Sequence, residues 1–139
     1  MSVVLDPYVN FRDETRQAME FNQRVFGGEL RMSTFKEYQA SQDASEDDKI
    51  MHAQLEADDI RLMAADTPNS MEYQPGTNFN LSLSGDDEQT LRGYFDKLLD
   101  GGSVVMPLEK APWGDTFGML VDRFGIRWLV NVNQAGQTG

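Results

Sequence analysis

His52 carries the side chain best suited to proton transfer at neutral pH, and it is the single histidine in the sequence. It lies in the segment 50–55, where polar and apolar residues alternate, which predicts a strand with two different faces. His52 and Gln54 share one face. The residues expected on the other, core-facing side are Met51, Ala53 and Leu55. An imidazole in this position can act as an acid or a base, so His52 is the candidate catalytic residue. A structural hydrogen bond is the alternative.

Other polar and aromatic residues fall on predicted strand faces, or at strand ends, away from the expected helices. They are Tyr8, Asn10, Asn78, Asn80, Trp113 and Arg127. Tyrosine and asparagine suit a partly buried, hydrogen-bonding environment better than a solvated face. With His52, these residues are predicted to bind a ligand in one shared cavity with walls supplied by Trp113 and Leu129. The alternative is that the asparagines only bridge strands.

Composition excludes several classes of function. The chain has no cysteine, which rules out disulfides, thiolate catalysis and Cys-ligated zinc. No Ser/His/Asp triad can be assigned, and no glycine-rich loop predicts a bound nucleotide or phosphate. The formal net charge of −11 disfavours nucleic acid as a partner. No apolar run approaches the ~20 residues of a membrane-spanning helix, and the start of the chain lacks a signal-peptide pattern. We therefore expect no membrane association and a cytoplasmic location.

An internal repeat sets the organisation of the chain. Six residues recur in matching chemistry at a constant offset of 74 positions. The pairs are Asp13 and Asp87, Phe21 and Phe95, Val25 and Leu99, Gly27 and Gly101, Leu30 and Val104, and Met32 and Met106. An offset of this length exceeds that of solenoid repeats, so each copy is predicted to be half of one domain spanning 1–139.

Each copy is predicted to fold as strand, helix and three further strands, which gives an α+β protein of two βαβββ modules at about 1–67 and 76–133. The first strands are expected at 8–11 and 78–83, with Phe79 among the residues that meet a helix. The helices are expected at 14–26, capped by Asp13, and at 87–100, capped by Asp86 or Asp87. The later strands are placed near 29–37, 48–57 and 60–66, and near 103–107, 116–122 and 126–132. The acidic run Asp43 to Asp48 is interpreted as a mobile loop.

Two βαβββ copies in one chain resemble the vicinal oxygen chelate fold of the glyoxalase/bleomycin resistance/dioxygenase superfamily. The sequence looks like its PhnB-like branch, which carries the label 3-demethylubiquinone-9 3-methyltransferase-like. The motifs that carry the resemblance are Pro7 to Phe11, Val25 to Gly28, Met51 to Ala53, Pro107 to Glu109, Trp113 to Asp115, Phe117-Gly118 and Asp122 to Trp128. The resemblance implies curved mixed sheets around a cavity. It also implies a homodimer.

Metal-dependent members of this superfamily bind one divalent ion through His, Gln or Glu at four strand positions. The matching positions here are Asp6 or Tyr8, Met63 or Ala64, Asn78, and Leu129. Methionine and leucine offer no donor to a hard or borderline cation, so no catalytic metal or other cofactor is expected.

The sequence supports three hypotheses about function and leaves open whether the chain is an enzyme. The first is a PhnB-like small-molecule-binding protein without the usual catalytic metal. The second is a metal-dependent lyase, isomerase or dioxygenase, and the third is a drug-sequestering resistance protein.

Overall fold

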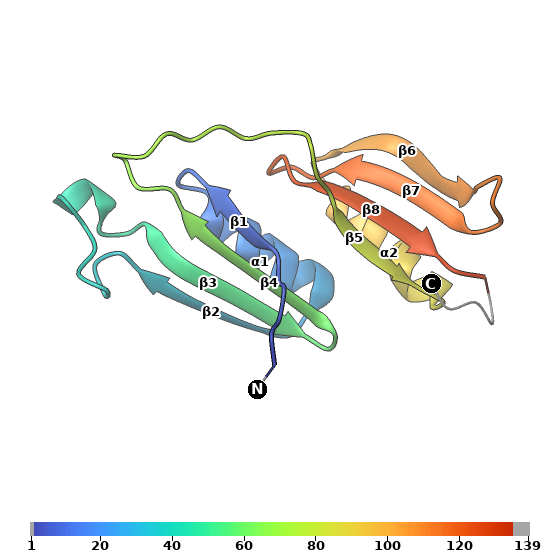
Figure 1. The fold of residues 1–139 in the computed structure, drawn as a ribbon, viewed down its shortest axis with the longest axis horizontal. Helices are drawn as coiled ribbons and strands as arrows, with labels where there is room; N and C mark the ends of the chain where they lie inside the picture. The colour runs from blue at the N-terminus through green and yellow to red at the C-terminus, as the bar shows by residue number, and fades with distance from the viewer. Residues whose placement is uncertain (1, 135–139) are drawn as a thin grey trace. The chain divides into compact units, whose positions relative to one another are not determined.

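Each half of the chain folds into a four-stranded mixed sheet with one helix packed on one of its faces (Figure 1). The computed structural model describes residues 2–134. It divides into unit 1, Met1–Pro75, and unit 2, Gly76–Gly139. The boundary falls at the end of residues 68–75, the linker between the two predicted modules. That both units make up one domain stays a prediction.

Unit 1 has the strand order β1-β4-β3-β2, with β1 parallel to β4 and the other pairs antiparallel. A 3-10 turn, η1, lies in the long segment between β2 and β3. The elements are β1 (Tyr8–Phe11), α1 (Thr15–Phe26), β2 (Glu29–Thr34), η1 (Ala44–Glu46), β3 (Ile50–Ala57) and β4 (Ile60–Asp66).

Unit 2 repeats this topology in the order β5-β8-β7-β6, and neither sheet closes into a barrel. The α+β, two-module fold predicted from the sequence is confirmed. The elements are β5 (Leu81–Gly85), α2 (Glu88–Leu98), β6 (Ser103–Lys110), β7 (Thr116–Val121) and β8 (Arg127–Val132). Among residues 2–134, no helix is long and apolar enough to cross a membrane.

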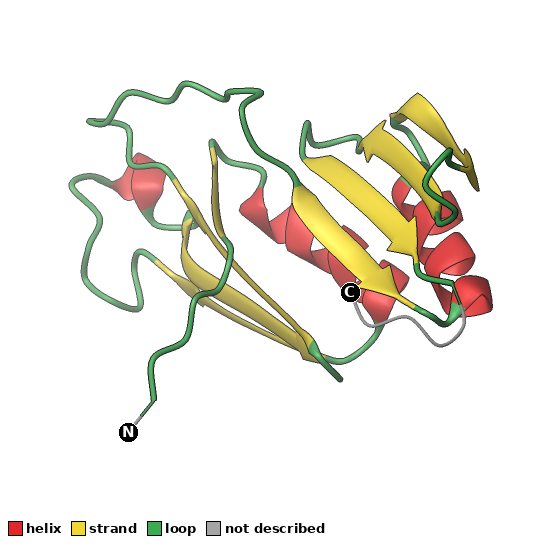
Figure 2. Ribbon diagram, turned by 45° about the vertical axis from the view of Figure 1, so that its right-hand side comes forward, coloured by secondary structure: helices red, strands yellow, loops and turns green. Residues whose placement is uncertain are grey.

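Alternation along the central strands separates a helix-covered face from an open face in each unit (Figure 2). In β8 the buried residues are Trp128, Val130 and Val132, as predicted. In β3 the buried residues from position 53 on are Ala53, Leu55 and Ala57. These side chains pack toward the apolar stripes of α2 and α1, which hold Phe95 and Phe21 respectively. Burial of these stripes supplies the main driving force for each unit.

A Gly-Gly pair lies between the helix and the next strand in both units. The backbone there passes close to a hairpin of the same unit, which leaves no space for a Cβ. A Cβ on Gly28 would collide with the carbonyl oxygen of Glu56. A Cβ on Gly102 would collide in the same way with that of Val121. The equivalent close approach explains why both copies of the repeat carry a Gly-Gly pair.

Asp13 does not cap α1, contrary to the prediction from sequence. The residue before the helix is Glu14, whose side chain makes no capping hydrogen bond. The Asp66 carboxylate at the end of β4 instead accepts from the Thr15 backbone N–H at 3.1 Å. In unit 2 the predicted cap is confirmed, since Asp87 accepts from the Thr90 N–H at 3.1 Å.

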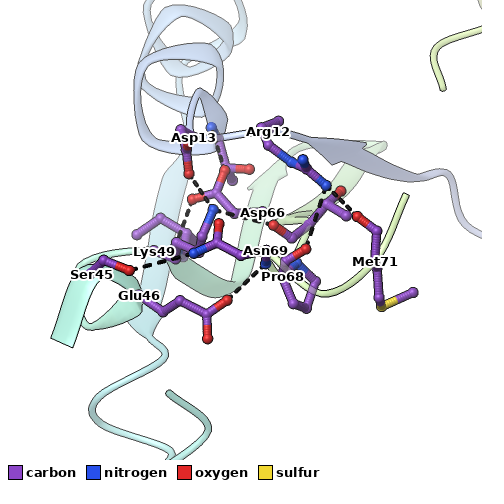
Figure 3. Close-up of polar contacts among 12 residues, drawn as sticks. Arg12, Asp13, Ser45, Glu46, Lys49, Asp66, Pro68, Asn69 and Met71 are labelled. Atoms are coloured by element: carbon purple, nitrogen blue, oxygen red, sulfur yellow. Dashed lines mark hydrogen bonds and ion pairs between the residues drawn. The ribbon is translucent and has the colours of Figure 1, made fainter. Parts of the chain in front are cut away.

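The acidic run that was expected to be a mobile loop contains η1 and a buried carboxylate (Figure 3). Glu46 accepts from the backbone N–H of Gln42 at 3.0 Å and of Asn69 at 2.7 Å. The buried Lys49 side chain pairs with Asp13 and donates to the Thr67 carbonyl. Satisfied buried charges order this segment, an outcome that its composition alone does not indicate.

Two side chains were assigned to the wrong face or element. Phe79 is 68% exposed and precedes β5. Among the described residues β5 pairs only with β8, and because β8 begins at Arg127 the pairing does not extend back to Phe79. Met51 is 39% exposed because a register shift at Ser33/Thr34 places Ile50 in the core instead. A bulge of this kind reverses side-chain parity locally.

Candidate functional site

The open face of unit 1 gathers hydrogen-bonding side chains from adjacent strands. His52, Gln54 and Glu56 follow one another at every second position of β3, on the side away from α1. Tyr8 comes from β1 and Arg61 from β4, which lies between β1 and β3. We call these five residues the relay residues, because consecutive members are joined by polar contacts.

The first contact of the relay joins two strands that are far apart in sequence. The Tyr8 hydroxyl lies 3.2 Å from His52 Nδ1, and the two ring centroids are 5.8 Å apart. His52 Nε2 lies 3.3 Å from Gln54 Oε1. The structure thus brings together two of the predicted ligand-binding residues, Tyr8 and His52. Both keep a surface open to a ligand, since Tyr8 is 46% exposed and His52 is half-buried.

The far end of the relay is ionic. Gln54 Nε2 donates to Glu56 Oε1 at 2.8 Å, and Arg61 lies 3.3 Å from the same carboxylate. Arg61 also donates to Asp6 at 3.1 Å. The sequence analysis placed Gln54 on this face but missed Glu56 and Arg61. Continuing the period-two pattern of β3 by one more step would have found Glu56.

Burial and charge act on the two ends of the relay differently. Burial raises the pKa of the Tyr8 hydroxyl, which keeps it protonated and able to donate. The hydrogen bond and charge of Asp6, with the charge of Glu56, raise the pKa of the Arg61 guanidinium. The face can therefore present a protonated phenol beside the His52 ring, next to a compensated ion pair.

The remaining predicted site residues are not among the relay residues. Asn10 is exposed on β1, on the same side as Tyr8 by strand parity. Asn78 is exposed in the segment before β5. Trp113 is 59% exposed and meets the Phe117 ring edge-on at 5.5 Å.

Asn80 and Arg127 lie close together at one end of the sheet in unit 2. They immediately precede Leu81 and Trp128, which are paired in the parallel β5–β8 ladder. Within residues 2–134, Asn80 Oδ1 and Arg127 Nε are both buried and have no hydrogen-bond partner. An unpaired acceptor and donor at one edge can bind a polar ligand group or water.

The densest polar cluster of unit 1 is the one in Figure 3, and its contacts are structural. Asp66 accepts from the backbone N–H of Thr15 and from that of Ile50 at 2.8 Å. Arg12 donates to the Pro68 and Met71 carbonyls of the linker. Because these contacts run from side chains to backbone groups of the connecting segments, the cluster fixes loops around the sheet.

The donor set for a divalent metal does not fit. Among residues 2–134, no group of three or more His, Asp or Glu side chains could hold a metal ion. Both ring nitrogens of His52 already have protein partners, and Glu56 is engaged by Gln54 and Arg61. The described residues therefore do not form a binding site for a divalent metal ion. The absence of a tightly bound metal in the purified protein stays a prediction.

Comparison with known proteins identifies the family. Residues 4–130 match the family model of the Glyoxalase/Bleomycin resistance protein/Dioxygenase superfamily. The chain belongs to this superfamily. The match spans both βαβββ units and confirms the resemblance drawn from the sequence motifs.

Relatives of similar length support the same assignment. Protein YjdN of Escherichia coli (strain K12) is 28% identical, over 92% of this chain and 94% of its own. The crystal structure of protein PA1353 from Pseudomonas aeruginosa is 35% identical, with a TM-score of 0.81 over 96% of this chain and 99% of that chain. A PhnB protein from Bacillus cereus is similar in fold, with 19% identity and a TM-score of 0.76 over 94% of this chain and 100% of that chain.

Proposed function

We propose that the protein binds a small polar molecule on the open face of unit 1, with Tyr8 and His52 in direct contact with it. The observation that carries the proposal is the Tyr8–His52 pair, which joins two strands on the face of the unit 1 sheet opposite α1. A partly exposed phenol and imidazole, held in place by strands, are groups that orient a ligand in a binding site.

Asn10 lies on the same face as Tyr8 and is part of this proposal. The predicted contacts in unit 2 are proposed separately, as residues that can meet a ligand on that unit. Asn80 and Arg127 offer an unpaired acceptor and donor there, and Asn78 and Trp113 are exposed. His52 is the candidate acid or base should the bound molecule be turned over. The metal-dependent alternative has no donor set in its favour among the described residues.

A thermal-shift screen tests the proposal. Metabolites are grouped as amines, polyols, carboxylates and phosphonates, because a ligand that binds the native state raises the melting temperature by mass action. Compounds that raise the melting temperature are then titrated into the wild-type and Tyr8→Phe proteins. The substitution removes one hydroxyl and should weaken binding about three- to tenfold. Tyr38→Phe is the matched control, since Tyr38 is exposed in the segment between β2 and β3. Equal affinity of both variants for every hit would refute the proposed site.

We also propose that the protein is a cytoplasmic homodimer. The edge strand β6 supports the dimer, because all of its residues are at least partly exposed and they include Val104, Val105 and Met106. An exposed apolar edge invites pairing with another strand, and a second copy of this chain is the occupant that needs no further component.

A further inference from the structure

Both ring nitrogens of His52 have polar partners, so the proton on the imidazole decides what the site offers to a ligand. A neutral imidazole carries one N–H donor and one acceptor nitrogen, and the neighbours determine which is which. Here Nδ1 faces the Tyr8 hydroxyl and Nε2 faces Gln54.

Glu56 fixes the orientation of the Gln54 amide. A carboxylate only accepts hydrogen bonds, so the Gln54 group that lies 2.8 Å from Glu56 Oε1 must be the NH₂ donor. The ion pair with Arg61 at 3.3 Å holds the Glu56 carboxylate in place. The Gln54 carbonyl oxygen is then directed at His52 Nε2.

We propose that Glu56 and Gln54 hold His52 as the Nε2–H tautomer, so that Tyr8 donates to Nδ1 and presents its remaining oxygen lone pair to the ligand. A carbonyl oxygen can only accept, so Nε2 must carry the proton. Nδ1 is then the acceptor, and the Tyr8 hydroxyl is its donor at 3.2 Å. Gln54 and Glu56 are positioning residues in this scheme.

This orientation predicts the chemical class of the ligand, a step that rests on the proposed function. The Tyr8 hydroxyl donates its hydrogen bond to His52, and the His52 Nε2–H donates to Gln54. The pair therefore offers a ligand an acceptor and no donor. Both guanidinium groups of this face are ion-paired, Arg31 with Glu29 and Arg61 with Asp6 and Glu56. The Tyr8–His52 pair therefore favours a ligand group that donates hydrogen bonds, such as a primary ammonium or hydroxyl group, over an anion.

The single histidine makes the tautomer directly measurable. Protein labelled with ¹⁵N-histidine gives one imidazole signal set, recorded without ligand at about pH 8, above the ordinary titration range of histidine. We expect a pyrrole-like Nε2 shift, a pyridine-like Nδ1 shift and a slowly exchanging Nε2–H proton. An Nδ1–H pattern in the wild-type protein overturns the inference.

Gln54→Lys separates positioning by Gln54 from the intrinsic preference of imidazole. An ammonium group can only donate, so Nε2 should become the acceptor and the ¹⁵N pattern should invert. Gln17→Lys adds the same charge at an exposed position of α1 and should leave the pattern unchanged. An uninverted pattern in folded Gln54→Lys protein overturns the positioning role.

Titration with putrescine and with inorganic phosphate tests the ligand class. Putrescine should shift the His52 signals, and Tyr8→Phe should weaken that binding about fivefold. Preference for phosphate, or no response to putrescine, overturns the predicted class. If the predicted tautomer is found but no ligand of any class binds this face, the proposed function fails while the tautomer assignment holds.

Discussion

The two units share one topology but hold their helices by different means. In unit 1 the first turn of α1 is bound by Asp66, which is 51 residues away in sequence from Thr15. In unit 2 the first turn of α2 is bound by Asp87, the residue next to the helix. A local cap closes a short loop, whereas Asp66 ties the end of β4 to both α1 and β3. The same fold therefore tolerates both a local and a long-range solution to one unsatisfied helix end.

The open faces differ as well. Unit 1 presents the polar relay residues, whereas on the open face of unit 2 the half-buried side chains in the middle of β7 and β8 include Phe117, Met119 and Leu129. Met119 and Leu129 are direct cross-strand partners. Strand pairing is the same in both units, so the chemistry of each face is set by side chains and not by backbone. The central strands thus carry more apolar side chains on the open face of unit 2 than on that of unit 1.

The largest difference should appear on removing the two helix-binding carboxylates. Asp66→Ala leaves the buried N–H groups of Thr15 and Ile50 without an acceptor and should lower the free energy of unfolding of unit 1 by about 2–5 kcal/mol. Asp87→Ala removes an exposed cap and should cost clearly less. Urea unfolding with amide exchange of both helices measures the effects. Equal losses in the two variants would contradict the distinction between local and long-range anchoring.

The segment between β2 and β3 has no counterpart of similar length in unit 2, so its buried carboxylate should matter to unit 1 alone. Glu46→Ala strips the acceptor from the N–H groups of Gln42 and Asn69 and should cost about 1–3 kcal/mol. Glu37→Ala, in the same segment but exposed, is the control and should have a minor effect. Hydrogen exchange at Gln42 and Asn69 reports the change. Unaltered protection there would show that Glu46 does not order the segment.

Asp122 is the buried carboxylate of unit 2, in the β7–β8 turn. Its Oδ1 accepts from the N–H groups of Phe124 and Ile126, and its Oδ2 from Trp128 Nε1 at 2.9 Å. Asp122→Asn keeps an oxygen for the two amides but turns an NH₂ toward the indole donor, so it should cost about 1–2 kcal/mol. The double variant with Trp128→Phe should show a smaller effect of the Asn substitution. Additive losses would argue against the Trp128 contact.

The stability difference between the wild-type protein and Asp122→Asn should depend on pH. Burial raises the pKa of Asp122 against the opposing effect of its three donors. The folded protein thus binds this proton more tightly than the unfolded chain. The contribution of this bound proton to the free energy of unfolding is fully present below the ordinary aspartate pKa of about 3.9. It is lost as pH rises through the raised pKa. The wild-type advantage should widen as pH falls from neutral, as measured by urea unfolding across pH. A pH-independent difference would contradict this.

The edge strands give the last contrast, because β2 carries Glu29 and Arg31 where β6 carries exposed valines. We expect a dimer mass by light scattering at micromolar concentration. Val105→Lys should raise the dissociation constant at least about tenfold, which corresponds to about 1.4 kcal/mol. Val3→Lys is the matched control, since Val3 is 99% exposed before β1. A monomer mass for the wild-type protein would rule the dimer out.

The sequence by itself determined the repeat, the class of fold and the two faces of β8. These follow from local periodicity, since alternation at β8 and the apolar stripes of the helices need no knowledge of distant residues. The Gly-Gly pairs and the Asp87 cap are likewise readable in place. Family membership followed from motifs that run through both copies.

Only the tertiary structure decided which polar groups meet. The partners of Thr15 and of His52 lie 51 and 44 residues away, and no local pattern specifies them. The parity error at Met51 has the same origin, because a bulge depends on how two strands pair. The acidic run misled for a related reason. Burying a carboxylate such as Glu46 is tolerated only when backbone donors converge on it and offset the loss of hydration. That convergence is a property of the folded chain.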